Sequence, residues 1–307
     1  MESISIIIPI YNRLKVTQQG LNYLYESLKH YNMKLKDAEK YHIRIIIVDD
    51  GSTDGSAEWI EKTYPQTEVL RSKGDLWWTG AINMGIKHAL KNHSKLKAVI
   101  LQNDDVVVEK DWIYTLIKTA EVNPNSLIGC ATCIDEKKER IFYGGRQLNS
   151  WFATEKKLNY DMPRDIFKSG FVIDSFDLYG RGLYIPIEVF DALGLFNAKK
   201  FKHRGDLDLP LRAKKAGFNL LVSYDAIVYE LPQYSFALDS KRHLSLKDIY
   251  RSLFDFRSSN SLSFIYNYSR IATKNPLQFI VFLLSNLFYN IRGIAWRYLK
   301  QQFPQNT

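Results

Sequence analysis

The chain has 307 residues, of which 46% are hydrophobic, 14% aromatic and 24% charged. This composition excludes a disordered or collagen-like chain, and the length suits one α/β catalytic domain with an appendage. The net charge of +9 is concentrated in residues 241–307, where ten Lys or Arg face two Asp, so the rest of the chain is almost neutral and offers no basic track for nucleic acid.

The first 135 residues alternate β-branched runs with helical patterns, which predicts a mostly parallel sheet covered by helices. The runs at 3–10 and 43–49 are rich in Ile and Val, as expected of strands buried on both faces. Further strands are expected at 67–71, 97–102 and 127–134, and helices at 15–30, 55–63, 79–92 and 110–121.

Polar residues gather where the first, second and fourth of these strands end. Open α/β sheets bind ligands outside the carboxyl ends of their strands. Three loops from distant parts of the sequence are therefore expected to line one crevice. They are the segments 11–13, 49–52 and 103–105.

Asp104 and Asp105 follow a strand whose apolar pattern continues through 106–108, so two charges stand where burial is costly without a partner. A hard divalent cation that also holds substrate phosphates would supply one. The alternative is that these carboxylates cap the helix that begins near 110–112. For the loop at Asp49, the corresponding alternatives are hydrogen bonds to a base or ribose, or a turn that caps the next helix.

Beyond residue 135 the pattern becomes less regular. The stretch 136–180 is predicted to be an insertion that shapes the substrate site, and 182–228 to form a strand, two helices and two short strands. Cys130 and Cys133 fit a buried strand better than a zinc or redox site, because no second Cys or His pair accompanies them. Two thiols and a first strand with no signal peptide before it favour a cytoplasmic protein.

In this order the motifs resemble glycosyltransferase family 2, whose fold is of the GT-A type, over residues 3–230. The resemblance implies an inverting transferase that uses Mg²⁺ or Mn²⁺. In the opening strand and second loop it implies nucleotide-sugar contacts by Pro9, Tyr11 and Asp49. It also implies that Asp104 lies near ribose or phosphate and that Asp105 binds the metal.

The segment 205–217 resembles the acidic motif of the same family and implies Asp206 as the catalytic base. A helix N-cap is the alternative for Asp206, and we interpret Asp208 and Arg212 as a surface ion pair. Many members have Glu-Asp where this chain has Gly205-Asp206. Some place a metal-binding His where this chain has Glu230, which could bind a hard cation instead.

The segment 74–86 resembles the rhamnosyl and galactofuranosyl branches of the family. Trp77 and Trp78 fit stacking on an acceptor or sugar ring, and packing is the equal alternative. Asn83 could approach the donor phosphates, although helix packing is the stronger interpretation.

The tail contains an apolar helical pattern over 276–300 that is interrupted by polar residues. Its longest charge-free stretch is too short to span a bilayer, so we expect an interfacial helix with aromatic and basic contacts to anionic lipid. The alternative is a helix that packs on the catalytic domain or on a second copy in a homodimer.

The sequence therefore predicts a catalytic domain over 1–240, with a nucleotide-sugar half (1–135) and an acceptor half (136–240), and a membrane-associating tail over 241–307. The expected partners are a UDP- or dTDP-sugar donor, with rhamnose or galactofuranose as the sugar, and a glycan acceptor that is lipid-linked. The expected setting is surface-polysaccharide synthesis on the cytoplasmic face of a bacterial inner membrane. Two alternatives are transfer to a polyprenyl phosphate and a non-catalytic protein that binds membrane or nucleic acid.

Overall fold

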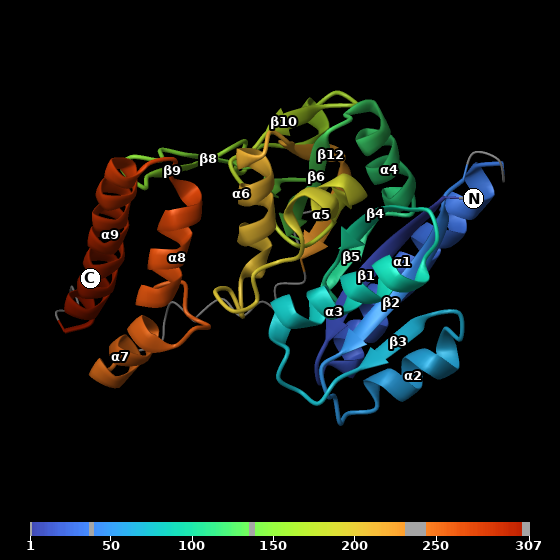
Figure 1. Cartoon of the computed structure of the whole chain (residues 1–307), viewed down its shortest axis with the longest axis horizontal. Helices are drawn as coiled ribbons and strands as arrows, with labels where there is room; N and C mark the ends of the chain where they lie inside the picture. The colour runs from blue at the N-terminus through green and yellow to red at the C-terminus, as the bar shows by residue number, and fades with distance from the viewer. Residues whose placement is uncertain (1, 37–39, 135–138, 231–243, 303–307) are drawn as a thin grey trace.

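A mixed β-sheet forms the centre of the computed structural model, which describes residues 2–36, 40–134, 139–230 and 244–302 (Figure 1). Its strands are β1 (Ser3–Ile10), β2 (His42–Asp49), β3 (Glu68–Arg71), β4 (Leu96–Leu101), β5 (Val106–Val108), β6 (Ser126–Ile134), β7 (Ile141–Tyr143), β10 (Val172–Asp174), β11 (Leu183–Pro186) and β12 (Asn219–Glu230). The order is β10-β12-β6-β11-β4-β1-β2-β3, with β5 beside β12 and β7 beside β6. A separate hairpin consists of β8 (Arg146–Leu148) and β9 (Glu155–Lys157).

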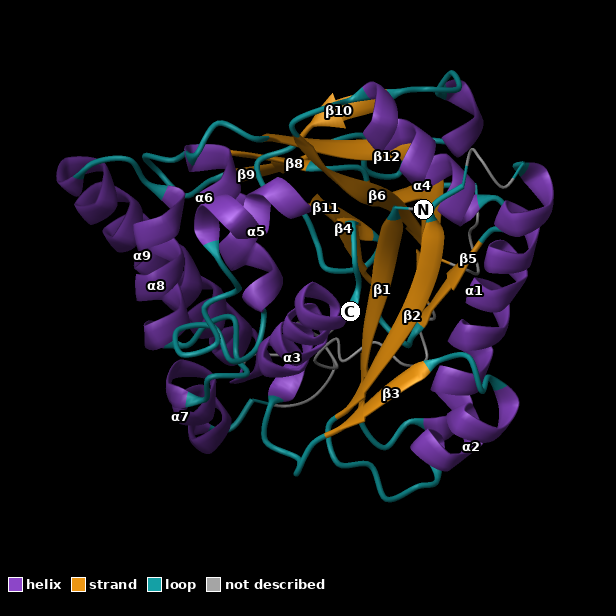
Figure 2. Cartoon of the chain, turned by 45° about the vertical axis from the view of Figure 1, so that its right-hand side comes forward, coloured by secondary structure: helices purple, strands orange, loops and turns teal. Residues whose placement is uncertain are grey.

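Helices cover both faces of the sheet (Figure 2). The first face packs against α1 (Leu14–Lys34), α2 (Ser56–Thr63) and α4 (Trp112–Val122), and the second against α3 (Trp77–Asn92), α5 (Ile187–Leu193) and α6 (Asp208–Lys215). Within β1, Ile6 and Ile8 belong to the first core and Ile7 to the second, because successive strand residues point to opposite faces. The expected α/β architecture and two-sided burial are confirmed.

One strand was not predicted, and one strand prediction was wrong. Val106–Val108 does not continue β4 but forms β5, which pairs antiparallel with the end of β12. The two short strands expected before residue 228 are one long strand, β12, whose register against β6 shifts between Ser223 and Val228. That irregularity interrupts the alternation of side chains, which made one strand look like two.

Cys130 and Cys133 are free thiols buried in β6. Burial raises the pKa of Cys130 to about 12 and that of Cys133 to about 11, so both are neutral thiols at physiological pH. The buried-strand interpretation is confirmed.

The tail forms three helices at the far end of the molecule from β3: α7 (Leu246–Phe254), α8 (Leu262–Ala272) and α9 (Pro276–Gln302) (Figure 1). Phe282 of α9 is fully buried and packs with Tyr268 of α8 and with Leu207 and Leu211, which lie beside and within α6. The tail is therefore attached to α6 and the turn before it through an apolar contact. The predicted boundary at residue 240 lies outside the described residues.

The predicted helix at 276–300 is confirmed as α9 and continues to Gln302. Asn275 caps it, since its Oδ1 accepts a hydrogen bond from the Gln278 backbone N–H at 2.9 Å. By length and composition, Pro276–Gln301 could cross a membrane, with a mean hydropathy of 1.4 and only 6% of that window buried in the protein. The helix includes the charged residues Arg292, Arg297 and Lys300, so the interfacial placement expected from its shorter charge-free stretch stays a prediction.

Candidate active site

The loops that follow β1 and β2 lie against each other at the carboxyl edge of the sheet. The Asn12 backbone N–H donates to Ser52 Oγ at 2.9 Å, and the Thr53 N–H donates to Asn12 Oδ1 at 2.7 Å. Asp54 accepts from the Leu14 N–H at 2.8 Å and from the Ser56 N–H at 3.1 Å, so one carboxylate joins the first turns of α1 and α2. The predicted convergence of these loops is confirmed.

The two carboxylates at the end of β2 have different roles. Asp49 is 2% exposed and accepts from the Ser52 N–H at 2.9 Å. Asp50 accepts from the Leu76 and Trp77 N–H groups at 3.0 and 2.8 Å and thereby fixes the start of α3. At the same edge, Tyr11 is 56% exposed and free to meet a ligand.

Asp104 is buried against α1. It is 6% exposed, accepts from Thr17 Oγ1 at 3.2 Å, and lies 3.4 Å from Arg13 Nη2. Burial raises the pKa of Asp104 to about 7, although Arg13 opposes the shift. At Gly20 of α1, a Cβ would stand 2.5 Å from the Asp104 carbonyl oxygen, so glycine is required for the helix to approach this closely.

Asp105 points to the more open side of the same turn. Its carboxylate is 26% exposed and lies 2.8 Å from Arg13 Nη2. The capping alternative for this pair was wrong: both carboxylates contact Arg13, and α4 begins seven residues later behind Asp111, whose side chain makes no capping bond.

Glu230, the second predicted metal ligand, lies at the same corner as Asp105. It ends β12 opposite Val106, next to Asp105, and forms an ion pair with Arg181. Burial raises the pKa of the Glu230 carboxyl, Arg181 opposes the shift, and the negative charge of Asp105 adds to it. Asp105 and Glu230 are hard oxygen ligands whose mutual repulsion a divalent cation would relieve, so the residues fit such an ion.

Asp206 lies in a short 3-10 turn that precedes α6, η4 (Gly205–Leu207). Its carboxylate is partly exposed and accepts from the Gly180 N–H at 3.2 Å, and it caps neither η4 nor α6. The N-cap alternative is therefore wrong. Burial raises the pKa of Asp206, which the Gly180 N–H, Arg181 and Arg204 oppose.

This chain has Gly205 where many members of the family have Glu before the acidic residue, and the difference has a steric cause. A Cβ at this position would stand 2.1 Å from Thr79 Oγ1 and 2.6 Å from Thr79 Cγ2. Thr79 is fully buried and donates to the Phe201 carbonyl oxygen at 2.5 Å, so it has no room to move. Glycine at 205 is what allows α3 to pack against the turn that carries Asp206.

Trp78 connects the two halves of the site. Its Nε1 donates to Asn103 Oδ1 at 3.1 Å, next to Asp104. A Cβ at Gly180 would lie 2.3 Å from Trp78 Cζ2 and 3.2 Å from Asp206 Cβ, so the indole packs beside the Asp206 side chain. Trp77 instead meets the edge of Phe256 at a centroid distance of 4.8 Å, with Lys202 over its ring.

Three further residues singled out in the sequence serve packing. Asn83 Nδ2 donates to the Phe196 carbonyl oxygen at 2.8 Å, and its Oδ1 accepts from the Phe196 N–H at 3.1 Å, which favours the packing alternative. Asp208 and Arg212 do pair, at 2.7 Å, but Asp208 is 2% exposed, so the expected surface pair is a buried one. Arg212 also donates to the carbonyl oxygens of Leu193 and Leu195.

Two arginines contact the predicted metal ligands: Arg13 pairs with Asp105, and Arg181 pairs with Glu230. The sequence interpretation included Arg13 in the loop 11–13 but gave it no role, and it missed Arg181. No local pattern marks Arg181, because only the antiparallel placement of β11 beside β4 brings it to this edge.

Comparison with known proteins extends these findings. Residues 5–183 match the family model described as Glycosyl transferase family 2. Glycosyltransferase GlyG of Streptococcus pneumoniae serotype 4 is 28% identical over 208 residues, which cover 65% of this chain and 62% of that protein. The chain thus spans less than two thirds of the length of this relative.

Three solved structures share the fold. The mannosyltransferase PcManGT from Pyrobaculum calidifontis, in complex with GDP-Man and Mn²⁺, has a TM-score of 0.56 at 15% identity and covers 96% of this chain and 71% of its own. GalNAc-T7 with UDP, GalNAc and Mn²⁺ has a TM-score of 0.55 at 13% identity, and the match covers 99% of this chain and 58% of that one. TarS 1–349 of S. aureus has a TM-score of 0.53 at 14% identity, and the match covers 99% of this chain and 93% of that one. The expected GT-A fold is confirmed.

Proposed function

Since the chain belongs to glycosyl transferase family 2, we propose that it transfers a sugar, with inversion, from a UDP- or dTDP-sugar to a glycan acceptor. The observation that carries this proposal is that one edge of the Trp78 indole reaches both carboxylate sites. Its Nε1 donates to Asn103, the residue before Asp104, and its neighbouring Cζ2 packs at Gly180, beside the Asp206 side chain. A donor held at one group faces a base at the other.

In this proposal Asp206 removes the proton from the acceptor hydroxyl. The acceptor oxygen attacks the anomeric carbon while the bond to the donor phosphate oxygen breaks, and its electron pair leaves with the nucleotide. One base is sufficient for such an in-line displacement, and no covalent intermediate forms on the enzyme. Burial raises the pKa of Asp206 above the ordinary value of an aspartate, which makes its carboxylate a stronger base.

Pro9, Tyr11 and Asp49 would hold the nucleotide at the carboxyl edge, with Asp104 toward ribose or phosphate. Asp105 and Glu230 would hold Mg²⁺ or Mn²⁺, which neutralises the charge of the leaving pyrophosphate. Burial of Asp104 against Thr17 favours an indirect role, in which it orients Arg13 and the Asp105 turn.

A cavity of about 620 Å³ lies between the β8–β9 hairpin and the tail, beside the turn that carries Asp206, and would receive the acceptor. Arg204 and Leu207, which flank the base in the chain, line this cavity, as does Tyr179 next to Gly180. Asn286, Tyr289 and Asn290 of α9 form the opposite wall. Aromatic rings and amides suit a carbohydrate, because they stack on its apolar faces and bond its hydroxyls.

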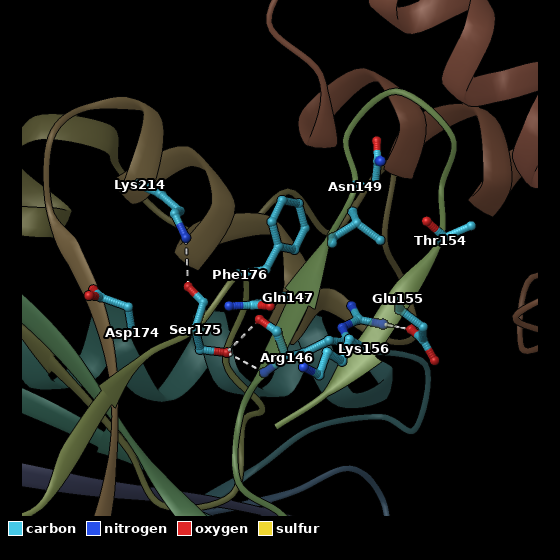
Figure 3. A pocket seen from close by; sticks show the side chains of 11 residues that line it. Arg146, Gln147, Asn149, Thr154, Glu155, Lys156, Asp174, Ser175, Phe176 and Lys214 are labelled. Carbon is cyan, nitrogen blue, oxygen red and sulfur yellow. Dashed lines mark hydrogen bonds and ion pairs between the residues drawn. The ribbon is translucent and has the colours of Figure 1, made fainter. Parts of the chain in front are cut away.

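A second hollow of about 520 Å³ adjoins this one on the β8–β9 hairpin (Figure 3). Arg146 and Glu155 line both hollows, and Lys214 donates to the Ser175 carbonyl oxygen at the rim of the second. The two hollows together would accommodate an acceptor longer than one sugar.

The tail would hold the enzyme on an anionic membrane. Leu277, Ile280, Leu284, Phe288 and Ile291 of α9 are each between 52% and 64% exposed and follow helical spacing, so they form one apolar stripe. Leu246, Tyr250 and Phe254 form a second on α7. With the basic charge of the tail, these stripes favour the cytoplasmic face of a bacterial inner membrane and a lipid-linked acceptor.

Nucleotide release from a panel of UDP- and dTDP-sugars, with and without EDTA, tests the catalytic proposal. Rhamnose and galactofuranose donors come first, because residues 74–86 resemble those branches. We expect one donor class to be used and EDTA to abolish release. Absence of turnover with every donor in the presence of Mg²⁺ and Mn²⁺ would oppose the proposal.

Variants of the two carboxylate groups separate their roles. Asp206→Asn should reduce transfer about 10²–10⁴-fold while donor binding persists. Asp105→Asn should weaken the response to metal. Full transfer by Asp206→Asn would favour a polyprenyl phosphate acceptor, whose oxygen is already ionised and needs no base.

A further inference from the structure

A cluster of two histidines and one glutamate lies at the other end of α3 from the active site. Glu68 begins β3, while His88 and His93 lie in and just beyond the last turns of α3. The three side chains place their ligand atoms within 4.8 Å of one another. His88 follows Trp77 by 11 residues along α3, so about 16 Å of helix separate this cluster from the tryptophans at the start of the helix.

Both imidazoles face the same carboxylate. His88 Nε2 lies 2.6 Å from Glu68 Oε2, and His93 Nε2 lies 2.9 Å from Glu68 Oε1. The other ring nitrogens have partners that orient the rings: His93 Nδ1 lies 2.7 Å from Ser5 Oγ, and His88 Nδ1 lies 3.1 Å from Asn92 Nδ2. Histidine ligands of metals are commonly held in this way by a second group on the far nitrogen.

From this geometry we infer that Glu68, His88 and His93 form a second metal site, which takes Zn²⁺ or a similar borderline cation. Two imidazoles, one carboxylate and a water make a four-coordinate zinc shell. This ligand set differs from the oxygen-only corner at Asp105 and Glu230, which suits Mg²⁺ or Mn²⁺. The carbonyl ends of α3 also favour a cation at this position.

Metal binding requires small rearrangements. Each neutral imidazole must carry its hydrogen on Nδ1, so that Nε2 is left for the ion. Ser5 Oγ accepts the Nδ1 hydrogen bond of His93. The side-chain amide of Asn92 must rotate by half a turn, so that its oxygen accepts the Nδ1 hydrogen bond of His88. Arg44 Nη1, 3.6 Å from Glu68 Oε1, must turn toward solvent, and its side chain is already 43% exposed. The bound ion would join β3 to the end of α3 and stabilise the nucleotide half.

Zinc titration of the tag-free, full-length protein tests this inference. The protein is stripped with EDTA, returned to excess MgCl₂ to saturate the oxygen corner, and titrated with ZnCl₂ by calorimetry while Tm is measured. We expect one Zn²⁺ per chain and a rise in Tm, because the ion binds the folded state. Co²⁺ in its place should give the visible absorption of a four-coordinate ion.

Variants locate the ion. His88→Ala should lower zinc affinity at least about tenfold, since even the loss of a group that only supports a ligand has that effect. His30→Ala, a histidine of α1 outside the cluster, and Asp105→Asn should both bind Zn²⁺ like the unmodified protein. Glu68→Gln, which keeps the side-chain volume, serves as the second variant if His88→Ala folds poorly.

Unchanged affinity in His88→Ala and Glu68→Gln would overturn the inference, as would the absence of binding by the unmodified protein. Loss of binding in Asp105→Asn would also overturn it, because the ion would then lie at the catalytic corner. None of these outcomes bears on sugar transfer, which is measured separately with Mg²⁺ or Mn²⁺.

Discussion

Asp104 and Asp105 are neighbours in the chain, yet their surroundings give them different chemistry. Asp104 is buried against Thr17 and α1, whereas the carboxylate of Asp105 is 26% exposed and faces Glu230. A buried carboxylate with such partners holds a loop in place, and an exposed one is available to an ion. Arg13 contacts both and keeps the turn together when no cation is bound.

At the residue scale, Gly205→Ala tests the steric account of the acidic motif. The added Cβ would overlap Thr79, so we expect a loss of about 1–3 kcal/mol in the free energy of unfolding. Urea denaturation measures it. Thr79→Ala should relieve part of the cost, so the double variant should be more stable than the sum of the two single changes implies. Strict additivity would contradict the account.

The pH dependence of transfer tests Asp206 as the base. Its pKa is raised above the ordinary 3.8 by burial, and the base acts only when deprotonated, so activity should fall as pH falls through that raised pKa. The profile of kcat/KM against pH measures this acidic limb. The residual activity of Asp206→Asn should show no acidic limb in this profile. If the limb is unchanged in that variant, it reports the titration of a group other than Asp206.

At the scale of elements, α9 has two apolar faces with different partners. Phe282 is fully buried against α6 and α8, while Phe288, less than two turns further along, is 60% exposed. Hydropathy gives both residues the same weight. Only the docking of the helix separates the face that stabilises the fold from the face that is left for a membrane.

Phe282→Ala and Phe288→Ala are therefore a matched pair. We expect Phe282→Ala to cost about 3–5 kcal/mol in the free energy of unfolding and Phe288→Ala to stay within about 0.5 kcal/mol. Sedimentation with phosphatidylglycerol vesicles should show the opposite order, with weaker binding for Phe288→Ala. Val122→Glu, at a 75% exposed site on α4, is the control for binding elsewhere. Equal binding by Phe288→Ala and the unmodified protein would contradict the proposed stripe.

At the scale of the whole molecule, the tail borders the proposed acceptor cavity and also carries the apolar stripe proposed for membrane binding. Residues of α9 form one wall of the cavity beside Asp206, and Phe282 covers Leu207, the next residue in the chain. Membrane attachment and acceptor binding would thus use opposite faces of one helix, which would present a lipid-linked glycan to the base.

Removal of residues 244–307 should accordingly impair more than membrane binding. Leu207 and Leu211 would be exposed beside the base, so we expect a lower Tm and loss of transfer even to an acceptor in solution. Differential scanning fluorimetry and nucleotide release measure the two effects. Leu284→Ser/Phe288→Ser, which keeps the docked face, should retain transfer in solution. Full turnover by the shortened chain would show that α9 does not help to form the acceptor site.

The sequence by itself determined the strands and helices of the first 135 residues apart from β5, the convergence of the three loops, the buried Cys130 strand and the helix at 276–300. These features follow from local periodicity and from the rule that parallel strands bring their carboxyl ends to one edge. Only the tertiary structure decided which groups meet across elements. It paired Arg181 with Glu230, brought β5 beside β12 and placed Thr79 against Gly205, because contacts between distant segments leave no periodic pattern in the chain.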